Sequence, residues 1–306
     1  MHLTEILHAA ERNRSEPTAI VRPGSPVVDN AATPVKRLRR TPAGGSADEP
    51  AAASRIGIDI GGSGIKGGRV DLATGALLGD RTRVDTPSPP SPRSVAKAVA
   101  TVVDLVEGDG PIGITFPGIV RGGVIGSAAN LRRSWLGTDA AALFADRLMR
   151  DVVILNDADA AGIAEMRFGA GRGKGGVVVV VTLGTGIGTA LFTDGHLVPN
   201  TELGHIIVAG MDGEKLAAAS VRTRKGLGWK AWSRRVSAYL ARLEALVSPD
   251  LLIIGGGISK EHEKFLPRLG TCAEIVPAQL FNDAGIVGAA LAAEVSMPTS
   301  RRAEGP

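Results

Sequence analysis

The chain has 306 residues, 44% of them apolar and 22% charged, with a net charge of +4, which permits a packed core in one large domain or two modest ones. The single cysteine, Cys272, excludes an intrachain disulfide framework and a Cys-rich zinc site, and it fits a reducing cytoplasm. No apolar run approaches the roughly 20 residues of a membrane helix, and residues 1–13 lack the apolar centre and cleavage site of a secretory signal. We therefore expect a cytoplasmic protein without a membrane partner.

Residues 1–54 are predicted to be a disordered tail. Pro, Ser, Ala, Gly and charged residues dominate this segment, and it has too few bulky apolar residues to offset the entropy of ordering. It contains one basic run, KRLRR at 36–40. Such a run either tethers a polyanion or is a set of solvated charges, and we favour the second interpretation because the pattern is weak on its own.

The ordered part of the chain begins at Arg55. Strands are predicted over residues 55–59, 65–71, 76–83, 112–116 and 152–155, and helices over 93–106 and 158–166. The pattern then restarts, with strands over 177–182, 190–193 and 251–254 and helices over 227–247 and 286–294. This two-fold repetition predicts two α/β lobes, each with a mixed sheet, and a cleft between them. We place a small lobe at 55–155, joined by the C-terminal helix at 284–296, and a large lobe at 156–283.

A glycine-rich turn follows the first predicted strand. Its candidate phosphate-binding residues are Asp59, Gly61, Gly62, Ser63, Gly64 and Lys66. Backbone N–H groups in such a turn can hold phosphate oxygens, and Lys66 adds positive charge. Asp59 is placed to orient a hydrated Mg²⁺, the cofactor that we expect, because this ion prefers carboxylate and phosphate oxygens. The alternative is an ordinary hairpin turn, since glycines alone are a weak signal.

A second turn of the same kind follows the buried strand predicted at 177–182. Its candidate phosphate-binding residues are Thr182, Gly184, Thr185 and Gly186. Two such turns in one chain can clamp one phosphate chain from both lobes, with the Thr185 hydroxyl donating to a phosphate oxygen. This repetition favours phosphate binding over a structural role.

A predicted strand ends and a predicted helix begins around Asp157. A carboxylate at this point is well placed to accept a proton from a sugar hydroxyl, and phosphoryl transfer needs such a base more than it needs covalent chemistry. Asp and Asn are also favoured at helix N-caps, which is the alternative role. We therefore predict that Asp157 is catalytic and that Asp159 caps the helix.

Three further side chains are candidate sugar contacts. Glu202 and His205 flank a glycine in ELGH, and both can hydrogen-bond vicinal hydroxyls. No Ser or Cys nucleophile stands near them in sequence, and partners for a zinc site are few. Asn130 is the third candidate, because its amide both donates and accepts. Trp135 is interpreted as a packing residue rather than a stacking platform.

A basic stretch lies within the predicted large lobe, at residues 222–235. It contains Arg222, Arg224, Lys225, Lys230, Arg234 and Arg235, with Trp229 and Trp232 among them. The stretch is either a track for a polyanion or the solvated face of a helix, and both interpretations stay open. The tryptophans have the spacing of core residues, so we expect no nucleic-acid partner.

These motifs, in this order, resemble the ROK family of sugar kinases and repressors over residues 55–295. Three strings are similar to its polyphosphate glucokinase branch: SAAN at 127–130 followed by Ser134 and Trp135, LVPNTELGH at 197–205, and NDAGIVGAA at 282–290. The resemblance implies a two-lobed actin/hexokinase-like ATPase fold with ribonuclease H-like sheets, and a homodimer. It also implies phosphoryl transfer from polyphosphate, and often from ATP, to the 6-hydroxyl of glucose.

The resemblance also assigns roles to individual residues. Asp157 would be the base, and the sugar would be held by Asn130, Asn156, Glu202 and His205, with Glu214 as a further candidate. Phosphates would be cradled by Gly61, Gly62, Gly64, Gly184, Thr185 and Gly186. The adenosine moiety of ATP would lie near Gly255, Gly256 and Gly257.

One departure from the family pattern matters. Many ROK proteins carry a Cys-rich zinc motif shortly after the E-x-G-H segment, but residues 208–221 contain no cysteine. We therefore expect no structural zinc, and Glu214 loses the motif that would anchor its alignment. Two other family members remain as alternatives. One is a kinase that uses only ATP, on glucose, mannose or an N-acetylated sugar. The other is a sugar-responsive repressor, which the lack of two adjacent amphipathic helices in residues 1–54 disfavours.

Overall fold

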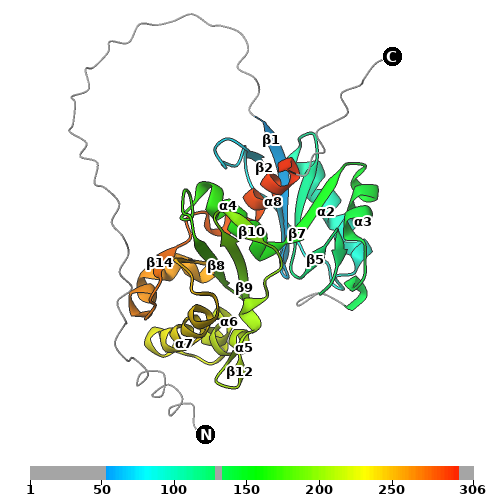
Figure 1. Cartoon of the computed structure of the whole chain (residues 1–306). Helices are drawn as coiled ribbons and strands as arrows, with labels where there is room; N and C mark the ends of the chain where they lie inside the picture. Colours follow the sequence, from blue (N-terminus) through cyan, green and yellow to red (C-terminus); the bar gives the residue numbers. More distant parts are fainter. Residues whose placement is uncertain (1–52, 128–132, 296–306) are drawn as a thin grey trace, which may run out of the picture. The chain divides into compact units, whose positions relative to one another are not determined.

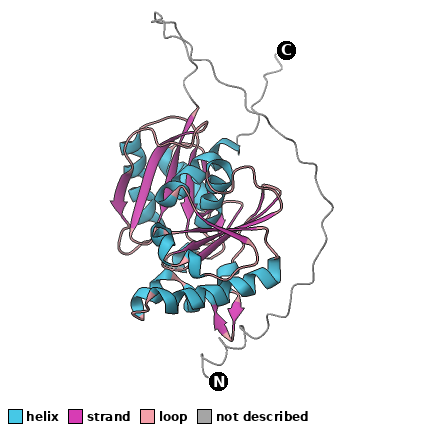
Figure 2. Ribbon diagram, turned by 90° about the vertical axis from the view of Figure 1, so that its left-hand side faces the viewer, coloured by secondary structure: helices cyan, strands magenta, loops and turns pink. Residues whose placement is uncertain are grey.

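The computed structural model describes residues 53–127 and 133–295. The predicted tail with its basic run at 36–40, and the candidate sugar contact Asn130, lie outside these ranges. Within them the chain forms two five-stranded sheets with helices packed around them (Figures 1 and 2). Both sheets belong to one compact unit that begins at Ala52.

The first sheet has the strand order β3-β2-β1-β4-β7. Its strands are β3 (Thr82–Asp85), β2 (Gly64–Asp71), β1 (Ser54–Ile60), β4 (Ile112–Phe116) and β7 (Val152–Asn156). β1 runs antiparallel to β2 and parallel to β4, and β4 runs parallel to β7. The carboxyl ends of β1, β4 and β7 therefore meet at one edge, where ligands bind in sheets of this kind.

The second sheet repeats this arrangement. Its order is β10-β9-β8-β13-β14, made of β10 (His196–Val198), β9 (Ile187–Thr193), β8 (Val177–Leu183), β13 (Leu251–Gly255) and β14 (Glu274–Pro277). β8 again pairs antiparallel with the strand that follows it and parallel with β13, which pairs parallel with β14. The repetition inferred from the sequence is thus present, and the prediction of an α/β fold with mixed sheets is confirmed.

The remaining elements cover the sheets and connect them. The helices are α2 (Pro92–Val106), α3 (Ala140–Leu148), α5 (Gly213–Ala217), α6 (Ala219–Arg224) and α7 (Trp229–Val247). The short strands are β5 (Val120–Arg121), β6 (Val124–Ile125), β11 (Ile207–Val208) and β12 (Met211–Asp212). The 3-10 turns are η1 (Arg133–Trp135), η2 (Leu203–His205), η3 (Gly257–Lys264), η4 (Leu266–Arg268) and η5 (Phe281–Asp283). No helix in the described ranges is long and apolar enough to cross a membrane.

Helices α4 (Asp157–Phe168) and α8 (Ala284–Val295) pack against each other, and α8 also lies on β1 and β4 of the first sheet (Figure 1). Glycine makes this close approach possible. A Cβ on Gly288 would lie 1.7 Å from the carbonyl oxygen of Ala160 in α4, and one on Gly57 would lie 1.9 Å from that of Ile286 in α8. Larger residues at these positions would push the helices apart.

Each sheet has its own apolar core. In the first, α2 buries valines at helical spacing, and Trp135 is fully buried with its ring centroid 4.9 Å from that of Phe116. The Trp135 indole N–H donates to the Pro90 carbonyl, so this tryptophan packs and does not offer a stacking surface, as predicted. In the second, α7 buries Trp232 against Phe265.

Several elements differ from the sequence predictions. The third strand was predicted at 76–83 but β3 begins at Thr82, because Gly79 has a φ of 94° and only Leu77 bridges to β2 before that point. Helix α3 was missed although Asp139 caps it, and β14 was missed because a four-residue strand ending in proline carries a weak pattern. Helix α7 begins at Trp229 rather than at residue 227.

Candidate active site

Asp59 lies at the carboxyl end of β1, where two other elements fix its carboxylate. The Thr115 hydroxyl on the adjacent strand β4 donates to Asp59 Oδ1 over 2.9 Å. Lys66 Nζ on β2 lies 3.3 Å from Asp59 Oδ2, directly across the β1–β2 ladder. The side chain is therefore oriented before any ligand binds, with one lone pair on each oxygen left over.

The first glycine turn closes the β1–β2 hairpin beside this carboxylate. Gly61 N–H donates to the Gly64 carbonyl over 3.0 Å, and Gly62 and Ser63 stand exposed at the tip. From β3, Arg83 donates to the Ser63 carbonyl over 2.9 Å. The Arg83 side chain thus supports the turn, while Gly62 and Ser63 remain exposed to solvent.

The second glycine turn closes the β8–β9 hairpin in the same way. Gly184 N–H donates to the Gly186 carbonyl over 3.0 Å. The Ser220 hydroxyl at the start of α6 donates to the Thr185 carbonyl over 2.6 Å. Glu214, at the start of α5, accepts from Ile187 N–H at 3.0 Å through Oε2, so one oxygen of this candidate sugar ligand supports the turn.

Asp157 is the first residue of α4, directly after β7. Its Oδ1 accepts the Ala158 N–H over 2.9 Å. Burial raises the pKa of Asp157 to about 7, with the Asp59 carboxylate adding to the rise and Glu202 contributing less. A carboxyl group with such a pKa is divided between its two protonation states near neutral pH, which suits a general base.

The helix cap is Asn156, and not Asp159 as predicted. Asn156 Oδ1 accepts from the N–H groups of Ala158 and Asp159 at 2.8 and 3.0 Å. Its amide nitrogen donates to the Gly118 carbonyl over 3.1 Å, which leaves one N–H for a ligand. The prediction was wrong because the helix already starts at Asp157, directly after β7. Asn156 is therefore the residue that flanks the helix, and Asp159 lies in its first turn.

A pocket of about 170 Å³ lies between the two sheets and gathers many of the predicted residues. Asp59, Lys66 and Asp157 line it from the first sheet and from α4, and Thr182 and Gly255–Gly257 line it from the second. Gly256 has a φ of 82°, and a Cβ there would lie within 3 Å of the Leu183 backbone, so the strand end fits against β8 only with glycine. The candidate base, the adenosine candidates and three of the phosphate candidates, Asp59, Lys66 and Thr182, therefore share one cavity, whereas the other residues of the two glycine turns are not among those that line it.

Glu202 and His205 lie in the segment that follows β10, at the η2 turn. His205 Nε2 lies 4.0 Å from Glu202 Oε2, and its Nδ1 lies 2.9 Å from Asp212 Oδ2. The hydrogen bond with Asp212 raises the pKa of His205, and burial raises that of Glu202. Because a carboxylate only accepts, Asp212 fixes the proton on Nδ1 and leaves Nε2 toward Glu202.

Asp212 was not identified from the sequence. It precedes α5, caps it through Lys215 N–H at 3.2 Å, and lies seven residues from His205. The only sequence signal was an acidic residue before a short helix, which predicts a cap and gives no reason to expect a histidine partner.

The chemistry of the pocket fits a magnesium ion. Within the described ranges no cluster of three or more His, Cys, Asp or Glu side chains has metal-site geometry. Mg²⁺ does not require one, because it keeps several waters and binds one or two carboxylates together with substrate phosphates. Asp59 is the residue that would hold it, since its carboxylate is preoriented and faces the pocket.

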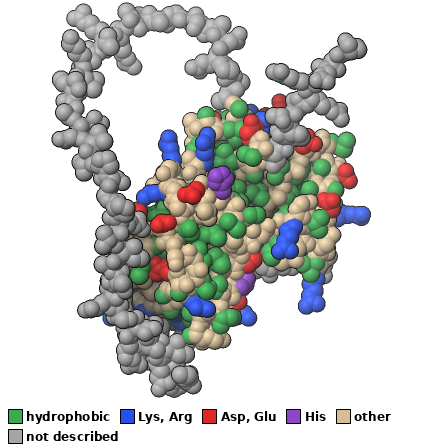
Figure 3. Space-filling view, viewed as in Figure 1, with side chains coloured by type: hydrophobic (Ala, Val, Ile, Leu, Met, Phe, Trp, Pro, Cys, Tyr) green, Lys and Arg blue, Asp and Glu red, His purple; other side chains and the backbone are tan. Residues whose placement is uncertain are grey.

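The basic stretch at 222–235 divides into two groups. Arg222 stacks on Trp229, with the guanidinium carbon 3.7 Å from the ring centroid, and Arg235 is half-buried. Exposed members are Arg224, Lys225, Lys230 and Arg234. On the face seen in Figure 3 the Lys and Arg side chains stand apart and form no continuous band.

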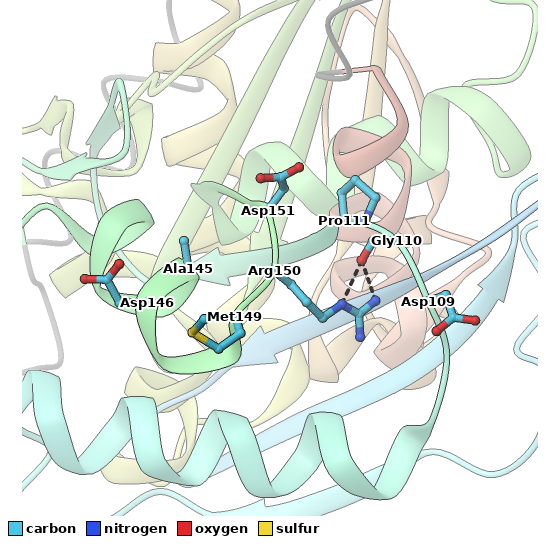
Figure 4. Close-up of a pocket in the computed structure, with 8 residues that line it drawn as sticks. All are labelled: Asp109, Gly110, Pro111, Ala145, Asp146, Met149, Arg150 and Asp151. Carbon is cyan, nitrogen blue, oxygen red and sulfur yellow. Dashed lines mark hydrogen bonds between the residues drawn. The ribbon is translucent and has the colours of Figure 1, made fainter. Parts of the chain in front are cut away.

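A larger hollow of about 660 Å³ lies away from this chemistry (Figure 4). Residues 109–111, 145–146 and 149–151 border it, before β4 and β7, so it lies at the amino ends of strands whose carboxyl ends carry the candidate site. Arg150 is its most prominent side chain, and its guanidinium donates to the carbonyls of Gly108 and Gly110. Arg150 therefore fastens a loop, and we assign no ligand to this hollow.

Comparison with known proteins agrees with this geometry. The sequence profile of the ROK family matches residues 55–227. A polyphosphate glucokinase of Mycobacterium tuberculosis is 50% identical over 238 residues, which cover 78% of this chain and 90% of that protein.

Solved structures give the same result. The inorganic polyphosphate/ATP-glucomannokinase of Arthrobacter sp. strain KM is 53% identical, with a TM-score of 0.78, over 80% of this chain and all of that one. A ROK family glucokinase of Streptomyces griseus, solved with glucose and AMPPNP, is 26% identical with a TM-score of 0.66, over 78% of this chain and 98% of that one. The predicted two-lobed actin/hexokinase-like fold is thereby confirmed.

Proposed function

The chain belongs to the ROK family, and from this premise we propose that it is a kinase that transfers a phosphoryl group from inorganic polyphosphate, and also from ATP, to the 6-hydroxyl of glucose. The product is glucose 6-phosphate. The observation that carries the proposal is the shared pocket, which Asp157 lines together with Asp59 and Lys66 from the first sheet and with Thr182 and Gly255–Gly257 from the second. The similarity to a polyphosphate glucokinase and to a polyphosphate/ATP-glucomannokinase supports the choice of donors.

Asp157 acts as the general base in this proposal. Its carboxylate takes the proton from the 6-hydroxyl while that oxygen forms a bond to the terminal phosphorus of the donor. The bridging P–O bond breaks, and its electron pair leaves with the shortened polyphosphate or with ADP. Such a base contributes roughly 10²–10⁴-fold to the rate. The pKa of about 7 keeps a substantial fraction of Asp157 ionised at neutral pH.

Charge on the donor is balanced by groups from both lobes. Lys66 lines the pocket, and the backbone N–H groups of Gly62, Ser63 and Thr185 are candidates to hold phosphate oxygens. Mg²⁺ held at Asp59 would neutralise negative charge on the transferring phosphoryl group.

The sugar is held on the other side of the base. Glu202 is close enough to Asp157 to affect its pKa, so the two carboxyl groups are candidates to contact neighbouring hydroxyls of one ring. His205, oriented by Asp212, presents Nε2 beside Glu202, and Asn156 keeps one amide N–H free. Asn130 and Glu214 complete the proposed set.

The test is glucose 6-phosphate formation in the presence of magnesium, with long-chain polyphosphate or ATP as the sole donor. Turnover with polyphosphate supports the proposal, and the ratio of kcat/KM values ranks the donors. Turnover with ATP alone retains the kinase and overturns the polyphosphate assignment. Absence of turnover with both donors on glucose, mannose and N-acetylated sugars overturns the kinase. We also propose a homodimer, which sedimentation equilibrium measures directly.

A further inference from the structure

One side chain connects the two lobes beside the proposed sugar site. Asn200 follows β10 of the second sheet, and its carboxamide binds both backbone polar groups of Val120, which lies in β5 after the first sheet's β4. Val120 N–H donates to Asn200 Oδ1 over 2.8 Å, and Asn200 Nδ2 donates to the Val120 carbonyl over 2.9 Å. The carboxamide thus pairs with the N–H and C=O of one residue, as the backbone of a neighbouring β-strand would. The two hydrogen bonds join residues that are 80 positions apart in the sequence.

Asn200 is itself held in an unusual backbone conformation. Its φ is 58°, in the left-handed region that asparagine tolerates better than most residues. Its N–H donates over 2.8 Å to Oδ2 of Asp159, in the first turn of α4 two residues after Asp157. The carboxyl group that fixes Asn200 is therefore carried by the same helical turn as the proposed base.

Asp159 is 2% exposed, and within residues 53–127 and 133–295 its buried Oδ1 has no hydrogen-bond partner. It does not cap the helix, because Asn156 does. Burying a carboxyl group for a single N–H bond is unfavourable, and an apolar residue would pack there at lower cost. The contact with Asn200 is the feature that explains an acid at this position.

The far end of the connection also leads to the site. Val120 lies two residues after Gly118, whose carbonyl accepts from the Asn156 amide, and one after Ile119, whose N–H donates to Ser127 Oγ over 2.9 Å. The segment 118–120 is thus held by two carboxamides. One stands next to Asp157 and the other stands two residues before Glu202.

We propose that Asn200, held by Asp159, is a positioning residue that sets the spacing between the base and the sugar-holding pair Glu202 and His205. The inference rests on the proposed function, since it assumes that these residues hold one acceptor sugar. It assigns to Asn200 no contact with substrate. Without this connection the segment that carries Glu202 and His205 loses its direct hydrogen bond to the turn that carries the base, their spacing is less well fixed, and glucose binding weakens.

The loop that carries Glu202 has its own support, so the connection can be removed without unfolding it. Thr189 in β9 binds the backbone at Thr201 and accepts from the Leu203 N–H at 3.1 Å, and the Tyr239 hydroxyl donates to the Leu203 carbonyl over 3.3 Å. These contacts lie within the large lobe. Asn200 provides the attachment of this loop to Asp159 in α4 and to Val120 in the small lobe.

The experiment compares four variants with the wild type. Asn200→Gly keeps the positive φ and removes the carboxamide, and Asp159→Ala removes the acceptor for Asn200 N–H. Asp159→Asn is the conservative variant, because its amide oxygen can still accept that bond. Asp139→Ala is the matched control, because it removes one side-chain bond to a backbone N–H, at Ala142 in α3, and Asp139 does not line the pocket.

For Asn200→Gly and Asp159→Ala we expect the glucose KM to rise by between about tenfold and hundredfold, since small displacements of positioned groups have effects of this size. The donor KM should stay within about twofold, Asp159→Asn should restore most of the glucose KM, and Asp139→Ala should leave both KM values unchanged. A glucose KM within twofold of wild type in Asn200→Gly overturns the inference. An equal rise in the glucose and donor KM values overturns it as well.

Amide hydrogen exchange provides a readout that does not need turnover. The Val120 N–H should exchange faster in Asn200→Gly than in the wild type and in Asp139→Ala, and unchanged protection overturns the connection itself. A wild type that does not phosphorylate glucose overturns the proposed function, while the exchange result still decides whether Asn200 holds Val120. The two failures are therefore distinguishable.

Discussion

The two sheets place equivalent hairpin turns beside the same pocket, but they equip them differently. In the first, Asp59 pairs with Lys66 one step before the hairpin closes at Ile60 and Ile65. In the second, Thr182 pairs with Gly188 one step before the hairpin closes at Leu183 and Ile187. The oppositely charged pair Asp59 and Lys66 in the first sheet thus corresponds to the uncharged pair Thr182 and Gly188 in the second.

The difference shows a division of labour between the lobes. A Cβ on Gly188 would lie 2.6 Å from Thr182 Oγ1 and 2.8 Å from Cβ of Ala158, the residue after Asp157. The second hairpin therefore gives up a side chain in order to pack directly on the start of α4. The first hairpin carries charged side chains at the pocket, while the second packs on α4, the helix that begins with the proposed base.

Replacing Asp157, the proposed base, should have the largest effect. This residue begins α4, the helix on which the second hairpin packs, so the variant tests whether that packing supports catalysis. We expect Asp157→Asn to lower kcat by roughly 10²–10⁴-fold, since the amide cannot take the proton. Glucose binding, measured by calorimetry without donor, should persist. A variant with near-wild-type kcat would remove Asp157 from the mechanism.

The pH dependence tests the charge on the first hairpin. The pKa of Asp157 is raised to about 7, first by burial and next by Asp59, and only the ionised form accepts a proton. Activity should therefore rise with pH, and kcat/KM for glucose should fall about tenfold for each pH unit below that pKa. In the residual activity of Asp59→Asn the acidic limb should move to lower pH. A profile that is flat from about pH 5 to 8 would contradict the assignment.

A pair of glycine variants separates packing from phosphate binding in the second hairpin. Gly188→Ala should lower the free energy of unfolding by about 1–3 kcal/mol, because the methyl group meets Thr182 and Ala158. Gly184→Ala adds a methyl group to open space, so its unfolding free energy should stay within about 0.5 kcal/mol of wild type. If phosphate binds this turn, the donor KM of Gly184→Ala should nevertheless rise. Urea unfolding and donor titrations measure both, and an unchanged donor KM would exclude the turn from the phosphate site.

The smallest expected effect concerns the exposed charges next to the second hairpin, whose own turn carries no charged side chain. Helix α6 is bonded to that turn through Ser220, and Arg224 and Lys225 stand exposed at its end. Neutralising both to Gln should raise the polyphosphate KM by a factor of about 2–5 and reduce its salt dependence, while the ATP KM stays unchanged. Neutralising Arg93 and Lys97, exposed on α2, is the matched control. Equal effects of both pairs would leave α6 as an ordinary solvated surface.

Local patterns were sufficient to predict much of the fold. The apolar runs at β4, β7 and β8 and the valine spacing of α2 identify these elements, because one buried face or a fully buried strand leaves its period in the sequence. The turns were marked by glycine for the same local reason. Elements with short or interrupted patterns, such as β14 and η3, were not found, because their positions depend on neighbouring elements such as β13.

The placement of two candidate site residues follows from the same local patterns. Asp59 and Asp157 stand at strand ends, and the rule that parallel strands end at one edge brings them together. The sequence by itself determined this polar edge and the two glycine turns, since both follow from the order of residues within single elements. Only the tertiary structure decided that Asp212 orients His205 and that Asp159 holds Asn200 against Val120. The contacts of Asn200 join residues 41 and 80 positions apart, which meet because the elements around the site pack together, and no local pattern records that packing.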